Sequence, residues 1–256
     1  MLILTLNEER NIERCLRSVH WSNDVVVLDS GSVDATIERA ARFSNVRIVE
    51  RAFTDYADQR NFGLQGIRYR NRWLFVLDAD EEASEALGDE LAGVAASGSN
   101  RLVYLVRRHV VLHGKVLRHN LTSTFWIERM LIPGAVRYYG AVHEKLQFNG
   151  ECGRLHGRIL HHQFDNGIDD WFRRRIRYAR LENAATDATG PSYRGPLSRR
   201  ILLKRIFRKL PARWAVYFIF NLIVSRAYLD GKEGVRYIWL EARSQYLANR
   251  CGRERV

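Results

Sequence analysis

The chain has 256 residues with 46% hydrophobic, 11% aromatic and 27% charged side chains and a formal net charge of +12. This composition excludes disordered and collagen-like chains and predicts one large globular domain or two small ones. The three cysteines are isolated, which excludes a disulfide framework and a cysteine zinc site and favours a reducing cytoplasm.

The first hundred residues alternate between short apolar runs and amphipathic stretches. The apolar runs cover residues 2–6, 25–28, 46–49 and 73–77 and are rich in β-branched residues, as buried parallel strands are. We interpret the first run as a strand and not as a secretory signal. Helices are predicted over residues 8–20, 35–43, 56–67 and 84–96. This alternation predicts a doubly wound α/β sheet, in which small molecules bind beyond the carboxyl ends of the strands.

The remainder of the chain changes character twice. Residues 101–163 are strand-like and irregular, with a hairpin expected around Gly114 and strands over 101–108, 125–132, 142–148 and 154–161. From Asp169 onward the pattern is helical. We therefore expect a domain over residues 1–165, with halves of about 1–100 and 101–165, and a helical extension over 166–256.

The positive charge belongs to the C-terminal third. Residues 1–170 hold 21 Lys and Arg against 23 Asp and Glu, whereas residues 171–256 hold 20 against 6, a net charge of +14. Such asymmetry points to a polyanionic partner, either nucleic acid or an anionic membrane, with a merely solvated helix face as the alternative.

Two neighbouring segments favour the membrane. Residues 197–210 form a basic amphipathic pattern, with Arg200, Lys204, Arg205, Arg208 and Lys209 among its cations. Residues 214–224 are apolar and aromatic but too short to span a bilayer. No nucleic-acid-binding motif accompanies the charge, so we predict attachment to an anionic membrane surface and no nucleic-acid partner.

Polar clusters follow three of the apolar runs. They begin at Asn7, Asp29 and Asp78, and helix capping is the alternative explanation for each of them, weakest for the cluster at Asp78. The closely spaced acids of Asp78-Ala-Asp80-Glu81-Glu82 repel one another unless a cation is present. A hard ion such as Mg²⁺ or Mn²⁺, bound through one or two carboxylates and the oxygens of a diphosphate, removes that repulsion.

Four segments in this order and spacing resemble the family 2 glycosyltransferases of the GT-A fold. They begin at Thr5, Val26, Gln59 and Leu77, and the resemblance covers about residues 1–190. Within that family the chain is similar to the bacterial branch that builds lipopolysaccharide core and exopolysaccharide. The segments that carry this narrower likeness are Val142-His-Glu144, His161 after Gly-Arg-Ile-Leu, and residues 228–234.

The resemblance implies a nucleotide-sugar donor, with a UDP-sugar as first choice, and Mg²⁺ or Mn²⁺ as cofactor. Asp29 would accept a hydrogen bond from the nucleotide base and Asp78 would contact the ribose or the water shell of the metal. Asp80 would bind the metal, completed by His161 or, as second candidate, His143. The remaining donor-binding residues implied are Thr5, Asn7 and Glu8 beneath the nucleotide and Gln59, Arg60 and Asn61 around the sugar and phosphates.

An inverting transfer needs a base that deprotonates the acceptor hydroxyl. Many family members use an aspartate of a Glu-Asp pair for this step, and the expected region of this chain has no such pair. Glu144 is our candidate, followed by Asp165 and by Asp169-Asp170. The last pair is explained more simply as acids at a helix N-terminus.

We therefore predict an inverting glycosyltransferase that acts on a lipid-linked, lipopolysaccharide or exopolysaccharide acceptor. It would lie in the cytoplasm, peripherally on the inner face of the plasma membrane. A polyprenyl-phosphate glycosyltransferase is the alternative among enzymes, and a non-catalytic basic binding module on the same scaffold is the alternative outside them.

Overall fold

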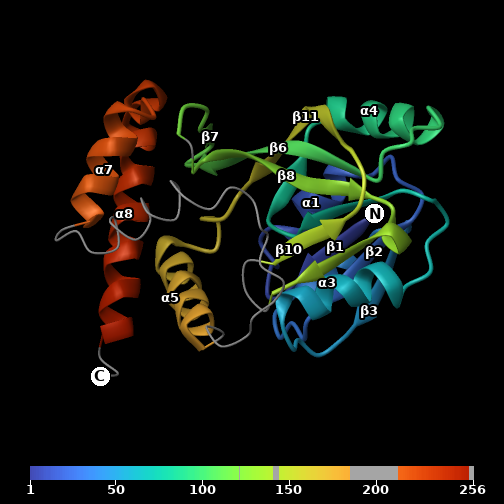
Figure 1. Ribbon diagram of the computed structural model, residues 1–256. Helices are drawn as coiled ribbons and strands as arrows, with labels where there is room; N and C mark the ends of the chain where they lie inside the picture. The colour runs from blue at the N-terminus through green and yellow to red at the C-terminus, as the bar shows by residue number, and fades with distance from the viewer. Residues whose placement is uncertain (121, 141–143, 185–212, 254–256) are drawn as a thin grey trace.

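The computed structural model describes residues 1–120, 122–140, 144–184 and 213–253 (Figure 1). It contains a nine-stranded mixed sheet with helices on both faces, a two-stranded sheet and a group of C-terminal helices. The strands are β1 (Leu2–Thr5), β2 (Val25–Asp29), β3 (Val46–Glu50), β4 (Leu74–Asp78), β5 (Glu81–Ala83), β6 (Val103–Leu112), β7 (Lys115–Val116), β8 (Thr124–Leu131), β9 (Val136–Tyr139), β10 (Lys145–Phe148) and β11 (Cys152–His161). The helices are α1 (Ile12–Ser18), α2 (Thr36–Ala40), α3 (Tyr56–Gln65), α4 (Glu85–Ala96), α5 (Ile168–Ala184), α7 (Arg213–Ile223) and α8 (Gly231–Arg253), with 3-10 turns η1 (Pro133–Ala135) and η3 (Ala227–Asp230).

The first half of the large sheet is parallel. Its strand order is β3-β2-β1-β4, and in its register Leu4 lies beside Leu28 on one neighbour and Asp78 on the other. The four strands predicted in the first hundred residues are thus confirmed to within two residues at each end. Because they run in one direction, their carboxyl ends share one edge of the sheet, where the polar clusters begin.

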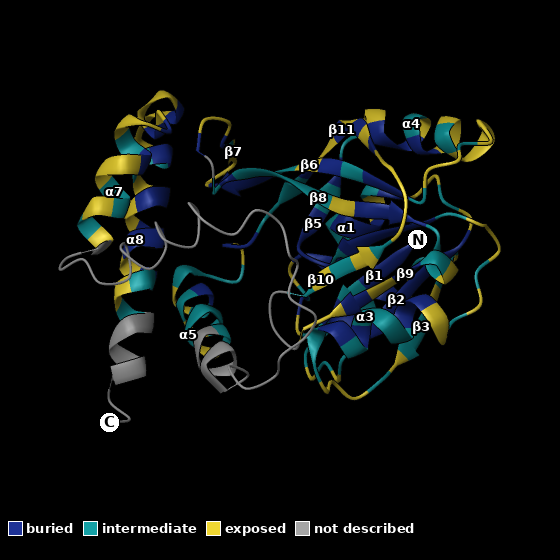
Figure 2. Cartoon of the chain, viewed as in Figure 1, coloured by how far each residue is buried: buried dark blue, intermediate teal, exposed yellow. Residues whose placement is uncertain are grey.

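Alternate residues of these buried strands pack on opposite faces of the sheet. Ile3 and Leu77 face a core shared with α1 and α4, whereas Leu2 and Val76 face a second core shared with α3. Figure 2 shows β2 as buried and β1 and β4 as mostly buried. Burial on both faces explains why the strand sequences are continuously apolar.

The second half of the sheet is mixed. The order continues β4-β8-β6-β11-β5, and β8 is antiparallel to both β4 and β6. The predicted hairpin is confirmed between β6 and β7, where His113 and Gly114 both have positive φ. The sequence interpretation missed β5, a three-residue acidic strand that pairs with β11, and β9, which pairs with β10. Both depend on partners distant in the chain.

The first predicted helix begins four residues later and ends two residues earlier than expected. Asn7 takes a left-handed conformation with φ of 55°, and the amide of Glu8 donates to Thr36 Oγ1 at 2.8 Å. Residues 7–11 are therefore held in a turn against the loop after β2, and α1 begins at Ile12.

The C-terminal helices pack on the far end of β6. Trp171 of α5 and Tyr237 of α8 enter a third core with Val110, Leu112 and Leu117 from the β6–β7 hairpin. Figure 1 shows α5, α7 and α8 on one side of the molecule, reached by this hairpin. No helix among the described residues is both long and apolar enough to cross a bilayer. The predicted basic helix over 197–210 lies outside the described residues.

Candidate functional site

A cavity of about 1140 Å³ lies beyond the carboxyl ends of β1 and β4 and extends to the C-terminal helices. Eight of the residues predicted from the sequence line it: Thr5, Glu8, Gln59, Arg60, Asp78, Asp80, Glu144 and His161. Asn7, Asp29 and Asn61 do not line it, and His143 lies outside the described residues. The far wall comes from the helices, through residues such as Arg175 of α5, Tyr217 of α7 and Glu241 of α8.

Asp29 and Asn7 hold the loops that border the cavity. Asp29 is 1% exposed, and its Oδ2 accepts hydrogen bonds from the amides of Gly31 and Ser32 at 2.8 and 2.7 Å. Asn7 Oδ1 accepts from the amide of Val33 at 2.9 Å. The bonds of Asp29 hold the loop after β2, and the bond from Val33 to Asn7 joins this loop to the loop after β1. Both side chains thereby support the edge of the cavity without lining it.

Gln59 and Asn61 lie close together in α3 but have different roles. Gln59 Nε2 donates to Ser30 Oγ at 3.2 Å and lines the cavity beside Thr5, whose buried Oγ1 has no hydrogen-bond partner among the described residues. Asn61 instead exchanges two hydrogen bonds with the backbone of Tyr138, at 2.8 and 2.9 Å. Asn61 therefore fastens α3 to β9.

A buried ion-pair network forms one wall. Asp78 Oδ1 lies 3.0 Å from Arg60 Nη2, and Asp78 Oδ2 lies 2.7 Å from Arg129 Nη2. Glu81 Oε1 accepts from Arg129 and Arg108 at 2.8 and 3.0 Å. Burial alone raises the pKa of Asp78, but Arg129 and Arg60 outweigh it and hold the pKa below its usual range. Both oxygens of Asp78 are thus occupied by arginines.

Glu144 joins the same wall from its other side. Its Oε1 lies 2.6 Å from Arg60 Nε, and the side chain lines the cavity. Arg60 thereby connects Glu144 to Asp78, and its guanidinium lies over the ring of Tyr138. The alternative base candidates have other partners: Asp165 pairs with Arg14 at 2.7 Å, and Asp170 lies in the first turn of α5.

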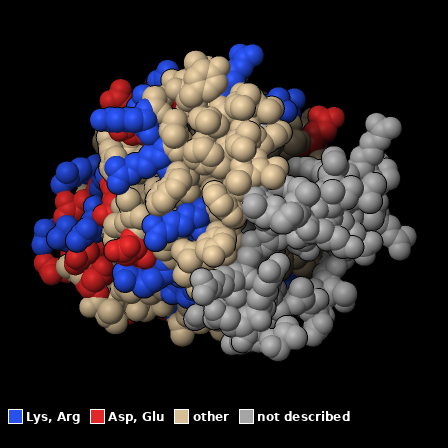
Figure 3. Space-filling model, turned by 90° about the vertical axis from the view of Figure 1, so that its left-hand side faces the viewer, with Lys and Arg blue, Asp and Glu red and all other residues tan. Residues whose placement is uncertain are grey.

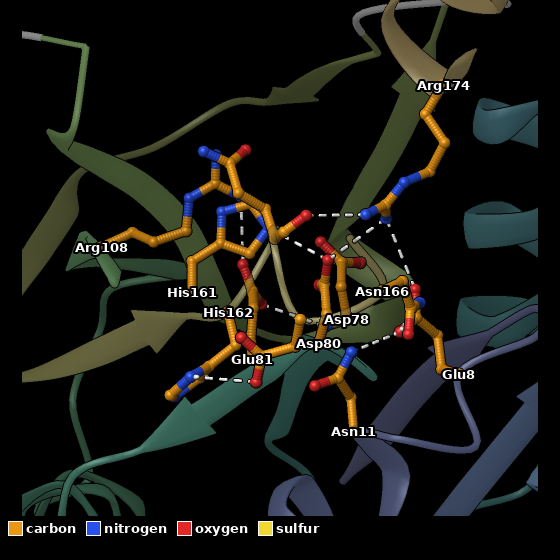
Figure 4. Close-up of polar contacts among 12 residues, drawn as sticks. Glu8, Asn11, Asp78, Asp80, Glu81, Arg108, His161, His162, Asn166 and Arg174 are labelled. Carbon is orange, nitrogen blue, oxygen red and sulfur yellow. Dashed lines mark hydrogen bonds and ion pairs between the residues drawn. The ribbon is translucent and has the colours of Figure 1, made fainter. Parts of the chain in front are cut away.

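Asp80 has a different environment (Figure 4). Its Oδ2 lies 3.2 Å from His161 Nε2 and 3.6 Å from Arg174 Nη1, and the same Arg174 nitrogen lies 3.4 Å from Glu8 Oε1. Burial and the negative charge of Asp80 raise the pKa of Glu8 to about 7. The Nδ1 of His161 is buried without a partner among the described residues.

These residues fit a divalent cation that also has ligands from a substrate. A carboxylate and an imidazole are suitable ligands, and the negative charge of Asp80 adds to the effect of burial in raising the pKa of Glu8. No group of three or more metal-ligating side chains occurs among the described residues. A cation here would therefore take Asp80 and His161 from the protein, its other ligands being substrate oxygens and water.

Sequence reasoning missed three arginines that pair with the acidic residues of this site. Arg108 and Arg129 come from β6 and β8, and Arg174 comes from α5. Their spacing in the chain carries no motif. The sole available signal was the presence of isolated cations in the strand-like and helical regions that the fold brings to the acidic cluster.

Known proteins share both the sequence pattern and the fold. A 166-residue segment, 62% of this chain, is 28% identical to the lipopolysaccharide core biosynthesis glycosyltransferase LpsC of Rhizobium meliloti (strain 1021), covering 61% of that protein. An uncharacterized glycosyltransferase of Rickettsia bellii (strain RML369-C) is 35% identical over 37% of this chain and 32% of its own length. The chain thus spans less than two thirds of either relative.

A solved structure extends the likeness to the fold. The mannosyltransferase PcManGT from Pyrobaculum calidifontis, crystallised with GDP-Man and Mn²⁺, superposes with a TM-score of 0.51 at 16% identity, covering 97% of this chain and 84% of that one. The expected GT-A fold is confirmed. The model of the glycosyl transferase family 2 matches residues 1–158, which is more than half of the chain. The protein therefore belongs to glycosyl transferase family 2.

Proposed function

We propose that the protein transfers a sugar from a nucleotide-sugar donor to a lipid-linked or lipopolysaccharide acceptor with inversion at the anomeric carbon. The observation that carries this proposal is a single cavity lined by Asp80, His161 and Glu144 in a family 2 chain. LpsC, a lipopolysaccharide core biosynthesis glycosyltransferase, supports the choice of acceptor, and PcManGT supports a nucleotide-sugar donor by its bound GDP-Man. We keep a UDP-sugar as the first donor to test.

In this proposal Asp80 and His161 hold Mg²⁺ or Mn²⁺. The bound cation neutralises the diphosphate of the leaving nucleotide. Asp78 has a supporting part, because two arginines occupy its carboxylate and hold it at the wall of the cavity. Thr5 and Gln59 line the donor end with polar atoms, while Asp29 and Asn7 keep the neighbouring loops in place.

Glu144 is the proposed base. Its carboxylate lines the cavity that contains Asp80 and pairs through one oxygen with Arg60, which fixes its orientation. It would accept the proton of the acceptor hydroxyl as that oxygen attacks the anomeric carbon. Attack on the face opposite the leaving diphosphate forms the new glycosidic bond with inversion.

An anionic membrane surface is the proposed location of the acceptor. The face of α7 that points away from the core carries Val216, Ile219, Phe220 and Ile223 at helical spacing, all at least 42% exposed. Figure 3 shows a broad neutral area on this side of the molecule, bordered by both basic and acidic side chains. An exposed apolar face beside a basic sequence supports interfacial binding.

Activity of matched variants tests the reaction. Release of nucleoside diphosphate from nucleotide sugars should require Mn²⁺ or Mg²⁺ and disappear in Asp80→Asn. Glu144→Gln should lower transfer by about 10²- to 10⁴-fold while donor binding persists, because this carboxylate acts on the acceptor. Lipopolysaccharide core and polyprenyl phosphate are compared as acceptors. Transfer to polyprenyl phosphate alone would favour the alternative enzyme, and full activity of Asp80→Asn would refute the metal role.

Vesicle binding tests the surface. The triple variant I219Q/F220Q/I223Q should bind anionic vesicles at least about tenfold more weakly than the wild type. Val33→Gln, which changes an apolar residue of 91% exposure elsewhere, is the matched control. Replacing Arg200, Lys204, Arg205, Arg208 and Lys209 by Gln should have the same effect. Equal binding to anionic and neutral vesicles, or stronger binding to duplex DNA at physiological salt, contradicts this proposal.

A further inference from the structure

Arg174 occupies the position between the two carboxylates at the centre of the site. One guanidinium nitrogen, Nη1, lies 3.4 Å from Glu8 Oε1 and 3.6 Å from Asp80 Oδ2 (Figure 4). Both carboxylates are buried, so their charges are poorly screened by solvent. Among the described residues, Arg174 therefore supplies the guanidinium closest to both Glu8 and Asp80.

The guanidinium is held by its own helix and by the loop before it. Its Nη2 donates to the carbonyl oxygen of Gln163 at 2.7 Å, and its Nε lies 3.0 Å from Asp170 Oδ2, one helical turn earlier. The helix in turn is anchored by Trp171, which is 2% exposed in the third core. Arg174 thus contacts Glu8 and Asp80 from an anchored helix outside residues 1–158, the segment that matches the family model.

We propose that Arg174 takes the place of the cation while no donor is bound and thereby makes cation binding depend on the nucleoside diphosphate. This inference rests on the proposed function. A divalent ion that approaches Asp80 alone meets the guanidinium charge beside the same oxygen, and that repulsion weakens its binding. A nucleoside diphosphate brings new anionic oxygens, with which a guanidinium forms paired, charge-assisted hydrogen bonds.

The consequence is an order of binding. Arg174 would shift from Asp80 and Glu8 to the diphosphate, leaving Asp80 available as a ligand, so the cation and the nucleotide would strengthen each other's binding. By thermodynamic linkage, the nucleotide raises the affinity for the cation by the same factor as the cation raises the affinity for the nucleotide. A guanidinium with a purely structural role would influence folding but not this coupling factor.

Calorimetry of Mn²⁺ binding, with and without UDP or GDP, tests the inference on the full chain without any turnover. The wild type should bind Mn²⁺ weakly alone and more tightly with the nucleotide. Arg174→Gln should bind Mn²⁺ alone about tenfold more tightly than the wild type, and its gain from the nucleotide should shrink by a similar factor. Arg173→Gln is the matched control, because Arg173 is the neighbouring residue and its side chain is 75% exposed.

The possible outcomes distinguish a failure of the role of Arg174 from a failure of the proposed function. An unchanged Mn²⁺ affinity and coupling factor in a folded Arg174→Gln overturns the role of Arg174. A wild type that binds neither UDP nor GDP in the presence of Mn²⁺ overturns the proposed function instead. If Arg174→Gln does not fold, Arg174→Lys decides. Lysine keeps the charge but not the paired donors, so the nucleotide gain should fall while affinity for Mn²⁺ alone stays near the wild-type value; an undiminished gain would contradict the inference.

Discussion

Asp78 and Asp80 are two residues apart and have opposite surroundings. Asp78 is paired with Arg60 and Arg129, whereas Asp80 faces a histidine and shares Arg174 with Glu8. A sequence motif cannot make this distinction, because the partners come from four other elements. It divides the pair into an acid that holds the wall together and an acid that is available to a cation.

The different surroundings of Asp78 and Asp80 predict that their substitutions change the free energy of unfolding by different amounts. Asp78→Asn leaves two buried guanidinium groups without their full counter-charge and should lower the free energy of unfolding by about 3 kcal/mol. Asp80→Asn should change it much less, because it also reduces the repulsion with Glu8. Urea denaturation of both variants without added metal measures the difference. Equal losses in the two variants would contradict the assignment.

The raised pKa of Glu8 predicts that the free energy of unfolding depends on pH. Its pKa is raised to about 7, so the folded state binds its proton more tightly than the unfolded state does. This stabilisation is complete below the ordinary pKa of about 4.5 and is lost as the pH rises towards 7. Glu8→Gln cannot titrate, so its stability relative to the wild type should rise across that window by up to about 3 kcal/mol. Urea denaturation with a chelator at pH 4.5, 6 and 7.5 measures this, and a constant difference would count against it.

At the scale of elements, Asn61 connects α3 with β9. Its amide forms both hydrogen bonds with the backbone of Tyr138, which is 7% exposed. Asn61→Ala should lower the free energy of unfolding by about 1 to 3 kcal/mol, because two backbone groups lose their partner. Donor affinity of the folded variant should stay close to the wild-type value. Loss of donor binding without loss of stability would indicate that Asn61 contacts the donor, as the resemblance implied.

The predictable elements are those whose pattern is local. Strands β1 to β4 are evident from continuous apolar runs, and the polar clusters follow from the rule that parallel strands share one edge. The short strand β5 was missed because pairing with β11 overrides its acidic sequence. Arg129 and Arg174 were missed for a related reason: their roles depend on which strand and helix pack beside Asp78 and Asp80.

At the scale of the whole molecule, the cavity joins two parts of different charge. Its strand end carries the acidic residues of a nearly neutral segment, and its far wall belongs to the strongly basic C-terminal third. The apolar face of α7 lies on that same third. This arrangement agrees with the proposal that the donor binds at the sheet and that the acceptor is presented from a membrane beside the helices.

If the cavity binds a nucleotide sugar together with a divalent cation at Asp80, as we propose, the two ligands together should raise the thermal stability of the protein. At a ligand concentration about one hundred times Kd, binding should add about 2.7 kcal/mol and raise Tm by about 5 to 10 °C. A panel of UDP- and GDP-sugars is compared with and without Mn²⁺, in the wild type and in Asp80→Asn. We predict a rise in Tm in the wild type when a nucleotide sugar and Mn²⁺ are both present, and none in Asp80→Asn. A panel in which no nucleotide sugar raises Tm, or in which Asp80→Asn responds as the wild type does, would contradict the account.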